Sequence, residues 1–118
     1  MHEQVYQFLQ DVAKQRECTT YAEVAQVAHL DLRSDRDREK FGEILSEIST
    51  HEHQEGRPLL TAVVLHGQGE QMRPDFFRLA RKLGVNQGAD DTEFFIEEIR
   101  RVHRYWCRPP PQVTPSDR

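Results

Sequence analysis

The sequence predicts a helix-dominated α+β fold. Apolar residues recur every three or four positions along most of the chain, which is the spacing of one face of a helix. One short apolar run without that period, at 59–65, lies between breakers and predicts a buried strand. The chain has 118 residues, so we expect one domain over 1–108 and a disordered, proline-rich tail over 109–118.

Three helices are predicted before the apolar run, over 3–16, 21–29 and 36–54. Thr19 and Thr20 interrupt the helical period and favour a short strand. Thr20 and Glu23 then have the spacing of a capping box, in which each side chain satisfies a backbone donor at the helix start. Gly56-Arg57-Pro58 ends the third helix, because proline cannot continue it.

Two further helices are predicted after the run, over 75–83 and 92–106. Gly84 is placed to cap the first of them, and acidic residues precede the second, where the positive end of the helix dipole favours them. Trp106 continues the apolar stripe of the last helix and is expected to belong to the core.

Two resemblances refine this fold. The segment Thr19-Thr20-Tyr21-Ala22-Glu23-Val24-Ala25 resembles the opening of alkyltransferase-like winged helices, but no Pro-Cys-His-Arg nucleophile motif follows, so no repair activity is implied. A closer similarity, over 19–106, is to small uncharacterised bacterial proteins with a Gly-Arg-Pro-Leu-Leu-[Ser/Thr]-Ala-Val-Val strand, matched here at 56–64. The resemblance implies a winged-helix-like domain with two extra C-terminal helices.

Composition and charge limit the classes of partner and the cellular location that we expect for this protein. The net charge of −4 does not favour nucleic acid by itself, although 16 Lys and Arg residues leave room for a local basic face. Cys18 and Cys107 match no disulfide framework, which is typical of free thiols in the cytoplasm. No leader peptide and no run long enough for a bilayer is present, so we expect a cytoplasmic protein without a membrane partner.

Catalytic and metal-binding motifs are weak. His51-Glu52-His53 lacks the His-Glu-x-x-His spacing of a zinc hydrolase, and Gly67-x-Gly69 lacks the lysine of a phosphate loop. His103 and Cys107, four residues apart on one helix face, have a spacing that metals can use, as do Glu47 and His51. We predict no catalytic residue, no metal and no cofactor.

Basic residues carry the leading functional hypothesis. They gather around the turn before the fourth helix, while those at 31–40 alternate with acids. The candidate nucleic-acid-binding residues are Arg73, Arg78, Arg81, Lys82, Arg36 and Arg38. A third group, Arg100, Arg101, Arg104 and Arg108, makes the end of the last helix basic.

The sequence therefore favours a small, non-enzymatic nucleic-acid-binding or regulatory module, with duplex DNA as its partner. The alternative is a protein–protein interaction or adaptor module with a protein partner or a second copy of the chain, and the net acidic charge favours it. An enzyme, or a subunit of one, is a second alternative.

Overall fold

The computed structural model describes residues 1–65, 74–85 and 90–107 and is helix-dominated, with a small parallel sheet. The elements in chain order are α1 (Glu3–Lys14), β1 (Thr19–Thr20), α2 (Tyr21–Ala28), α3 (Asp35–Gln54), the 3₁₀ helix η1 (Leu60–Val63), β2 (Val64–Leu65), α4 (Pro74–Lys82) and α5 (Asp91–Trp106). All five predicted α-helices are confirmed, within two residues at each end. The predicted tail and the glycines of the 66–73 turn lie outside the described residues.

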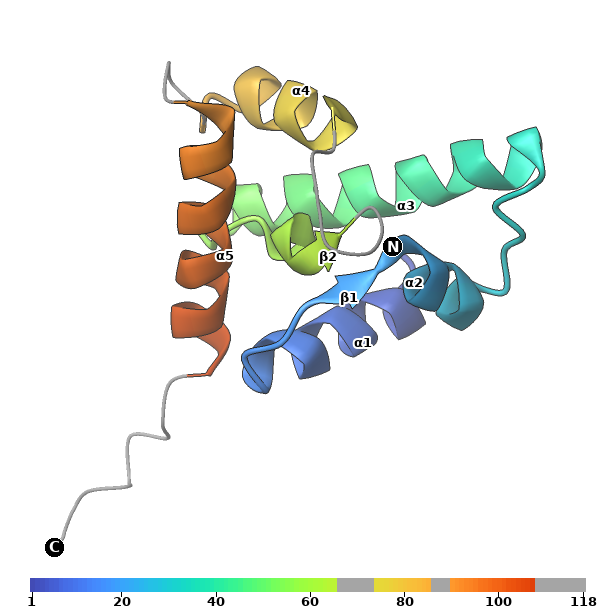
Figure 1. The fold of residues 1–118 in the computed structure, drawn as a ribbon, viewed down its shortest axis with the longest axis horizontal. Coiled ribbons are helices and arrows are strands. Elements are labelled where there is room, and N and C mark those ends of the chain that lie inside the picture. Colours follow the sequence, from blue (N-terminus) through green and yellow to red (C-terminus); the bar gives the residue numbers. More distant parts are fainter. Residues whose placement is uncertain (66–73, 86–89, 108–118) are drawn as a thin grey trace, which may run out of the picture.

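The helices are arranged around η1 and the two strands (Figure 1). The long helix α3 crosses the molecule, and α5 runs across the end at which α3 finishes. In the same view α4 lies on one side of α3, while α1 and α2 lie on the other. The start of α3 and the outer face of α5 are therefore at opposite ends of the molecule.

The predicted strand at 59–65 is wrong for most of its length. Residues 60–63 form η1, and only Val64 and Leu65 pair, in parallel register with Thr19 and Thr20. The partner strand is short because Thr20 already caps α2: its side-chain oxygen accepts a hydrogen bond from the backbone N–H of Glu23 at 3.3 Å. Within the described residues the rest of the run has no strand beside it, and a 3₁₀ turn satisfies part of its buried backbone, with the N–H of Ala62 donating to Leu59 O at 3.0 Å.

The core is centred on η1, which contacts α1, α3 and α5. The burial predicted for the apolar run is confirmed, because every residue from 58 to 64 is buried. A second aromatic group joins α4 to the start of α5: the ring of Phe76 lies 5.7–6.0 Å from the rings of Phe77, Phe94 and Phe95. Trp106 packs against the core but is only partly buried.

Four helices end with the same pair of backbone hydrogen bonds, in which a residue with positive φ follows the last turn. Gly84 plays this part after α4, as predicted: its φ is 78°, and the N–H of Val85 donates to Ala80 O at 2.9 Å. The other three positions are Gly56, Arg16 and His29. Within the described residues, no helix has both the length and the apolar character needed to cross a bilayer.

Candidate functional site

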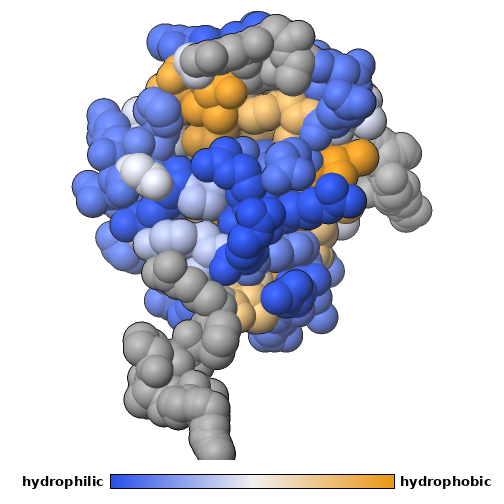
Figure 2. All heavy atoms as spheres, turned by 90° about the vertical axis from the view of Figure 1, so that its left-hand side faces the viewer, coloured by the Kyte–Doolittle hydropathy of each residue, from blue (hydrophilic) through white to orange (hydrophobic). Residues whose placement is uncertain are grey.

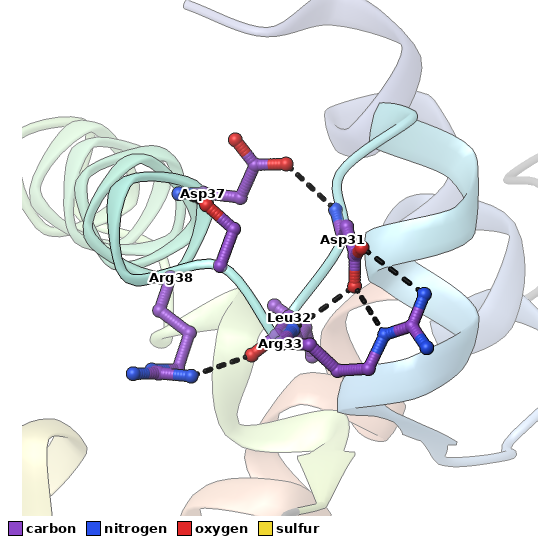
Figure 3. Close-up of polar contacts among 6 residues, drawn as sticks. Asp31, Leu32, Arg33, Asp37 and Arg38 are labelled. Carbon is purple, nitrogen blue, oxygen red and sulfur yellow. Dashed lines mark hydrogen bonds and ion pairs between the residues drawn. The ribbon is translucent and has the colours of Figure 1, made fainter.

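The loop between α2 and α3 is held together by its own side chains (Figure 3). The Asp31 carboxylate accepts hydrogen bonds from the backbone N–H and the guanidinium of Arg33, at 3.0–3.2 Å. The backbone N–H of Asp31 in turn donates to the Asp37 carboxylate at 2.8 Å. The hydrogen bonds from Arg33 hold the pKa of the Asp31 carboxyl below its ordinary value, so this carboxylate stays charged to lower pH.

The start of α3 is fixed to the same loop. Ser34 is the N-cap, and its side-chain oxygen accepts a hydrogen bond from the backbone N–H of Asp37 at 3.3 Å. Arg38 reaches back along the helix, forms an ion pair with Asp35 and donates to the carbonyl of Leu32 at 2.8 Å. The orientation of the first turn of α3 relative to α2 is therefore set by several hydrogen bonds.

The N-terminal part of α3 projects from the rest of the molecule. No residue from 35 to 40 is buried, and Phe41 is the first buried residue of the helix. Figure 1 shows this end of α3 extending past α2, to which the loop joins it. A protruding, polar helix end of this kind is accessible to a large partner.

The predicted residues Arg36 and Arg38 both lie on this exposed part. The side chain of Arg36 has no hydrogen bond or ion pair with any described residue, whereas that of Arg38 bonds Asp35 and the carbonyl of Leu32. The segment 31–40 holds four acidic and four basic residues, so its net charge is zero (4 − 4). Any anion bound here is held by individual guanidinium groups and not by a broad positive field.

The other predicted residues lie on α4, apart from Arg73, which is outside the described residues. Arg78 and Lys82 are exposed. Arg81 forms an ion pair with Asp91, in which its Nη2 lies 2.7 and 2.8 Å from the two carboxylate oxygens, and this pair ties α4 to the start of α5. Arg81 therefore has a structural contact to lose, while the side chains of Arg78 and Lys82 have no hydrogen bond or ion pair with the part of the chain that the structure describes.

The structure does not bring the two predicted groups together. Lys82 lines a hollow with α3 residues between Ser46 and Gln54. Arg38 precedes Ser46 by about 12 Å along the helix axis, at about 1.5 Å per residue. The described candidate residues thus form two separate surfaces, one at the start of α3 and one beside its second half.

A buried ionic cluster was not foreseen from the sequence. The Glu52 side chain on α3 is 0% exposed, and both its oxygens accept hydrogen bonds from the Arg57 guanidinium at 3.0 Å. The Tyr6 hydroxyl donates to the same carboxylate at 2.6 Å, and the Arg57 guanidinium lies 6.0 Å from the Trp106 ring centre. The sequence signal was present: Glu52 continues the buried stripe that includes Ile48.

This environment raises the pKa of both Tyr6 and Arg57. Burial, and then the hydrogen bond to Glu52, raises the pKa of Tyr6 from 10.0 to about 12. The hydrogen bonds to Glu52 raise the pKa of Arg57 above its ordinary value, so the guanidinium stays charged throughout the accessible pH range. The cluster holds α1, the end of α3 and the loop after it in one fixed arrangement.

The side chains that the sequence offers as possible metal ligands form hydrogen bonds or ion pairs with other protein groups. His103 Nε2 lies 2.9 Å from the carbonyl oxygen of Glu17, and Arg16 donates to the Cys107 sulfur at 3.4 Å, so both join the end of α5 to the turn after α1. Glu47 forms an ion pair with the amino group of Met1 at 3.4 Å. Among the described residues, no three His, Cys, Asp or Glu side chains are placed to share a metal ion.

Comparison of the chain with models of protein families, with curated proteins and with solved structures finds no match.

Proposed function

We propose that this chain is a small nucleic-acid-binding module that contacts duplex DNA with α2, the loop 29–34 and the first two turns of α3. The observation that supports this most is the unburied segment 35–40, held at a fixed angle to α2 by the contacts of Asp31, Ser34 and Arg38. In helix-turn-helix proteins the N-terminal residues of the second helix reach base edges in the major groove while the first helix crosses the backbone.

The element order supports a winged-helix interpretation of this unit. A helix, a short strand and two further helices are followed by a strand that pairs with the first. In this proposal Arg36 contacts a base edge, since guanine accepts two hydrogen bonds from a guanidinium. Arg33, whose side chain is 91% exposed, and Lys40 are placed for phosphates, which position the protein without reading sequence.

The charge balance predicts weak binding with moderate salt dependence. Neutralising about four phosphates, one for each of Arg33, Lys40, Arg78 and Lys82, gives a slope of about −3.6 in a plot of log affinity against log salt. The net charge of −4 opposes long-range attraction, so the association is not strongly steered. The exposed Arg78 and Lys82 form a second, separate contact to the flanking backbone.

The test is fluorescence anisotropy of a labelled duplex, titrated at low and at physiological salt. The double variant Arg36→Glu and Lys40→Glu should bind at least tenfold more weakly, while glutamates near the start of a helix keep the fold stable. A matched control, Lys14→Glu and Arg100→Glu, changes the net charge equally on exposed positions of α1 and α5 and should bind like the wild type. Wild-type protein that shows no salt-sensitive binding, or equal losses in both double variants, would contradict the proposal.

A protein-interaction module is the second candidate function, because a hollow between α1 and α2 favours it. The hollow has a volume of about 400 Å³ and combines apolar Phe8, Val12 and Val27 with three acids, Asp11, Glu17 and Glu23. No Lys or Arg is among the described residues that line it, so a basic amphipathic segment of a partner protein fits its charge. Failure of duplex binding, together with binding of a basic peptide that Asp11→Lys abolishes, would favour this function.

A further inference from the structure

A second buried carboxylate holds an arginine on the outer side of α5. The Glu98 side chain is 1% exposed; one oxygen accepts the backbone N–H of Leu59 at 2.7 Å and the other accepts the Arg101 guanidinium at 2.8 Å. Arg101 itself is 46% exposed, so part of its guanidinium faces solvent. Because the buried Glu98 carboxylate accepts a hydrogen bond on each oxygen, it holds the Arg101 side chain in place before any ligand binds.

Two hollows adjoin at Arg101. One, of about 250 Å³, is lined by His53, Arg57 and Glu98 together with the chain 56–59, Val85 and Arg101. The other, of about 380 Å³, is lined by Gly56, Pro58, Arg101, Arg104 and Tyr105. They share Gly56, Pro58 and Arg101, and together they have the size of a small-molecule site.

Positive charge is in excess around these hollows. Arg57 and Arg101 are each matched by one buried carboxylate, Glu52 and Glu98. On the exposed side, Arg100 and Arg104 share the single carboxylate of Glu97, each at 3.7 Å. Figure 2 shows the face that includes α5, with strongly hydrophilic residues over its middle. Counting only the described residues, one guanidinium charge is therefore left over beside the hollow lined by Arg104.

We propose that this depression binds a phosphorylated small molecule of the nucleotide class, with phosphate oxygens on Arg101 and Arg104 and its planar ring against Tyr105. A guanidinium can donate two parallel hydrogen bonds to phosphate, and Arg101, already held by Glu98, loses little freedom on binding. The ring of Tyr105 lines the same hollow and is braced by Trp106, with ring centres 5.1 Å apart. This site goes beyond the proposed DNA contact, since α5 and the start of α3 are at opposite ends of the molecule (Figure 1).

Isothermal titration calorimetry of the full chain with ADP and, separately, with pyrophosphate tests the site. Both should bind the wild type, ADP more tightly, and Arg104→Gln should weaken both about tenfold, as loss of a charged hydrogen bond does. Tyr105→Leu should weaken ADP and leave pyrophosphate unchanged. Arg100→Gln is the matched control, because it removes the same charge and the same contact to Glu97 without lining the hollow.

The outcomes separate this site from the DNA contact. The double variant Arg36→Glu and Lys40→Glu should bind ADP like the wild type, and Arg104→Gln should bind duplex DNA like the wild type. Absence of binding by the wild type at millimolar ligand, or an equal loss of affinity in Arg100→Gln and Arg104→Gln, would overturn the proposal. Retained ADP affinity in Tyr105→Leu would overturn the stacking of the ring.

Discussion

At the residue scale, the ends of α1 and α2 are unusual because the residue with positive φ after the last turn is not a glycine in either helix. Arg16 and His29 have φ values of 57° and 59°, in the region where an L-residue costs about 1–2 kcal/mol. Arg16 has a side-chain contact there, since it donates to the Cys107 sulfur at 3.4 Å. His29 is exposed and has no side-chain hydrogen bond to any described residue, so its backbone strain has no visible compensation.

We therefore expect His29→Gly to stabilise the protein. Glycine removes the strain and loses some of the gain through its freer unfolded chain, so the free energy of unfolding should rise by about 0.5–1 kcal/mol. Gly56→Ala is the mirror experiment: φ is 77° and an added Cβ meets nothing within 4 Å, so the backbone alone should cost about 1 kcal/mol. Urea unfolding followed by circular dichroism measures both. A less stable His29→Gly variant would show that the imidazole has a stabilising role.

At the element scale, the helices and the short strand at Thr19–Thr20 could be predicted from the sequence, but the extent of the strand in the run 59–65 could not. Helical period and capping residues such as Thr20 and Gly84 are local signals, and they placed α1 to α5. The sequence of the apolar run 59–65 does not indicate how long its partner strand is. Here the partner, β1, has only two residues. Polar residues inside the core are a further non-local feature: Ser49 of α3 and Thr61 of η1 are both buried, with hydroxyl oxygens 2.6 Å apart.

This buried hydroxyl pair should couple α3 to η1. Thr61→Val removes the hydrogen-bond partner of Ser49 inside the core and should lower the free energy of unfolding by about 1–3 kcal/mol. Replacing both residues, with Ser49→Ala and Thr61→Val, leaves no buried Ser49 hydroxyl and should cost less than the sum of the single variants. The Ser49→Ala variant completes the double-mutant cycle, read from chemical unfolding. Strict additivity would mean that the two hydroxyls do not stabilise each other.

At the scale of the whole molecule, two buried carboxylates connect segments that are far apart in the sequence. Glu52 binds Tyr6 and Arg57, and Glu98 binds Leu59 and Arg101, so one short segment after α3 is held to both α1 and α5. Such pairings depend on the folded arrangement, and residue spacing alone did not reveal them. For the same reason the sequence placed basic residues on the correct helices but could not show that Arg81 is bound to Asp91, or that α3 keeps Arg36 away from Lys82.

The Tyr6–Glu52–Arg57 cluster predicts a loss of stability at alkaline pH. The pKa of Tyr6 is 10.0 in its ordinary state and about 12 in the folded protein, so the folded state keeps the phenol proton after the unfolded state has lost it. The resulting stabilisation is complete below pH 10 and is lost as the pH rises to about 12. Arg57 does not titrate in this window, because Glu52 holds its pKa above the ordinary value.

Comparison of the wild type with Tyr6→Phe isolates this contribution. At pH 8 the variant lacks one hydrogen bond to Glu52 and should be less stable by about 1 kcal/mol or somewhat more, since the acceptor is charged. Between pH 10 and 12 the wild type should lose more stability than the variant, and the two free energies of unfolding should converge. Urea titrations at a series of pH values give both curves. Parallel curves across that window would show that the phenol loses its proton in the folded state as readily as in the unfolded chain, and that the contact with Glu52 does not hold it.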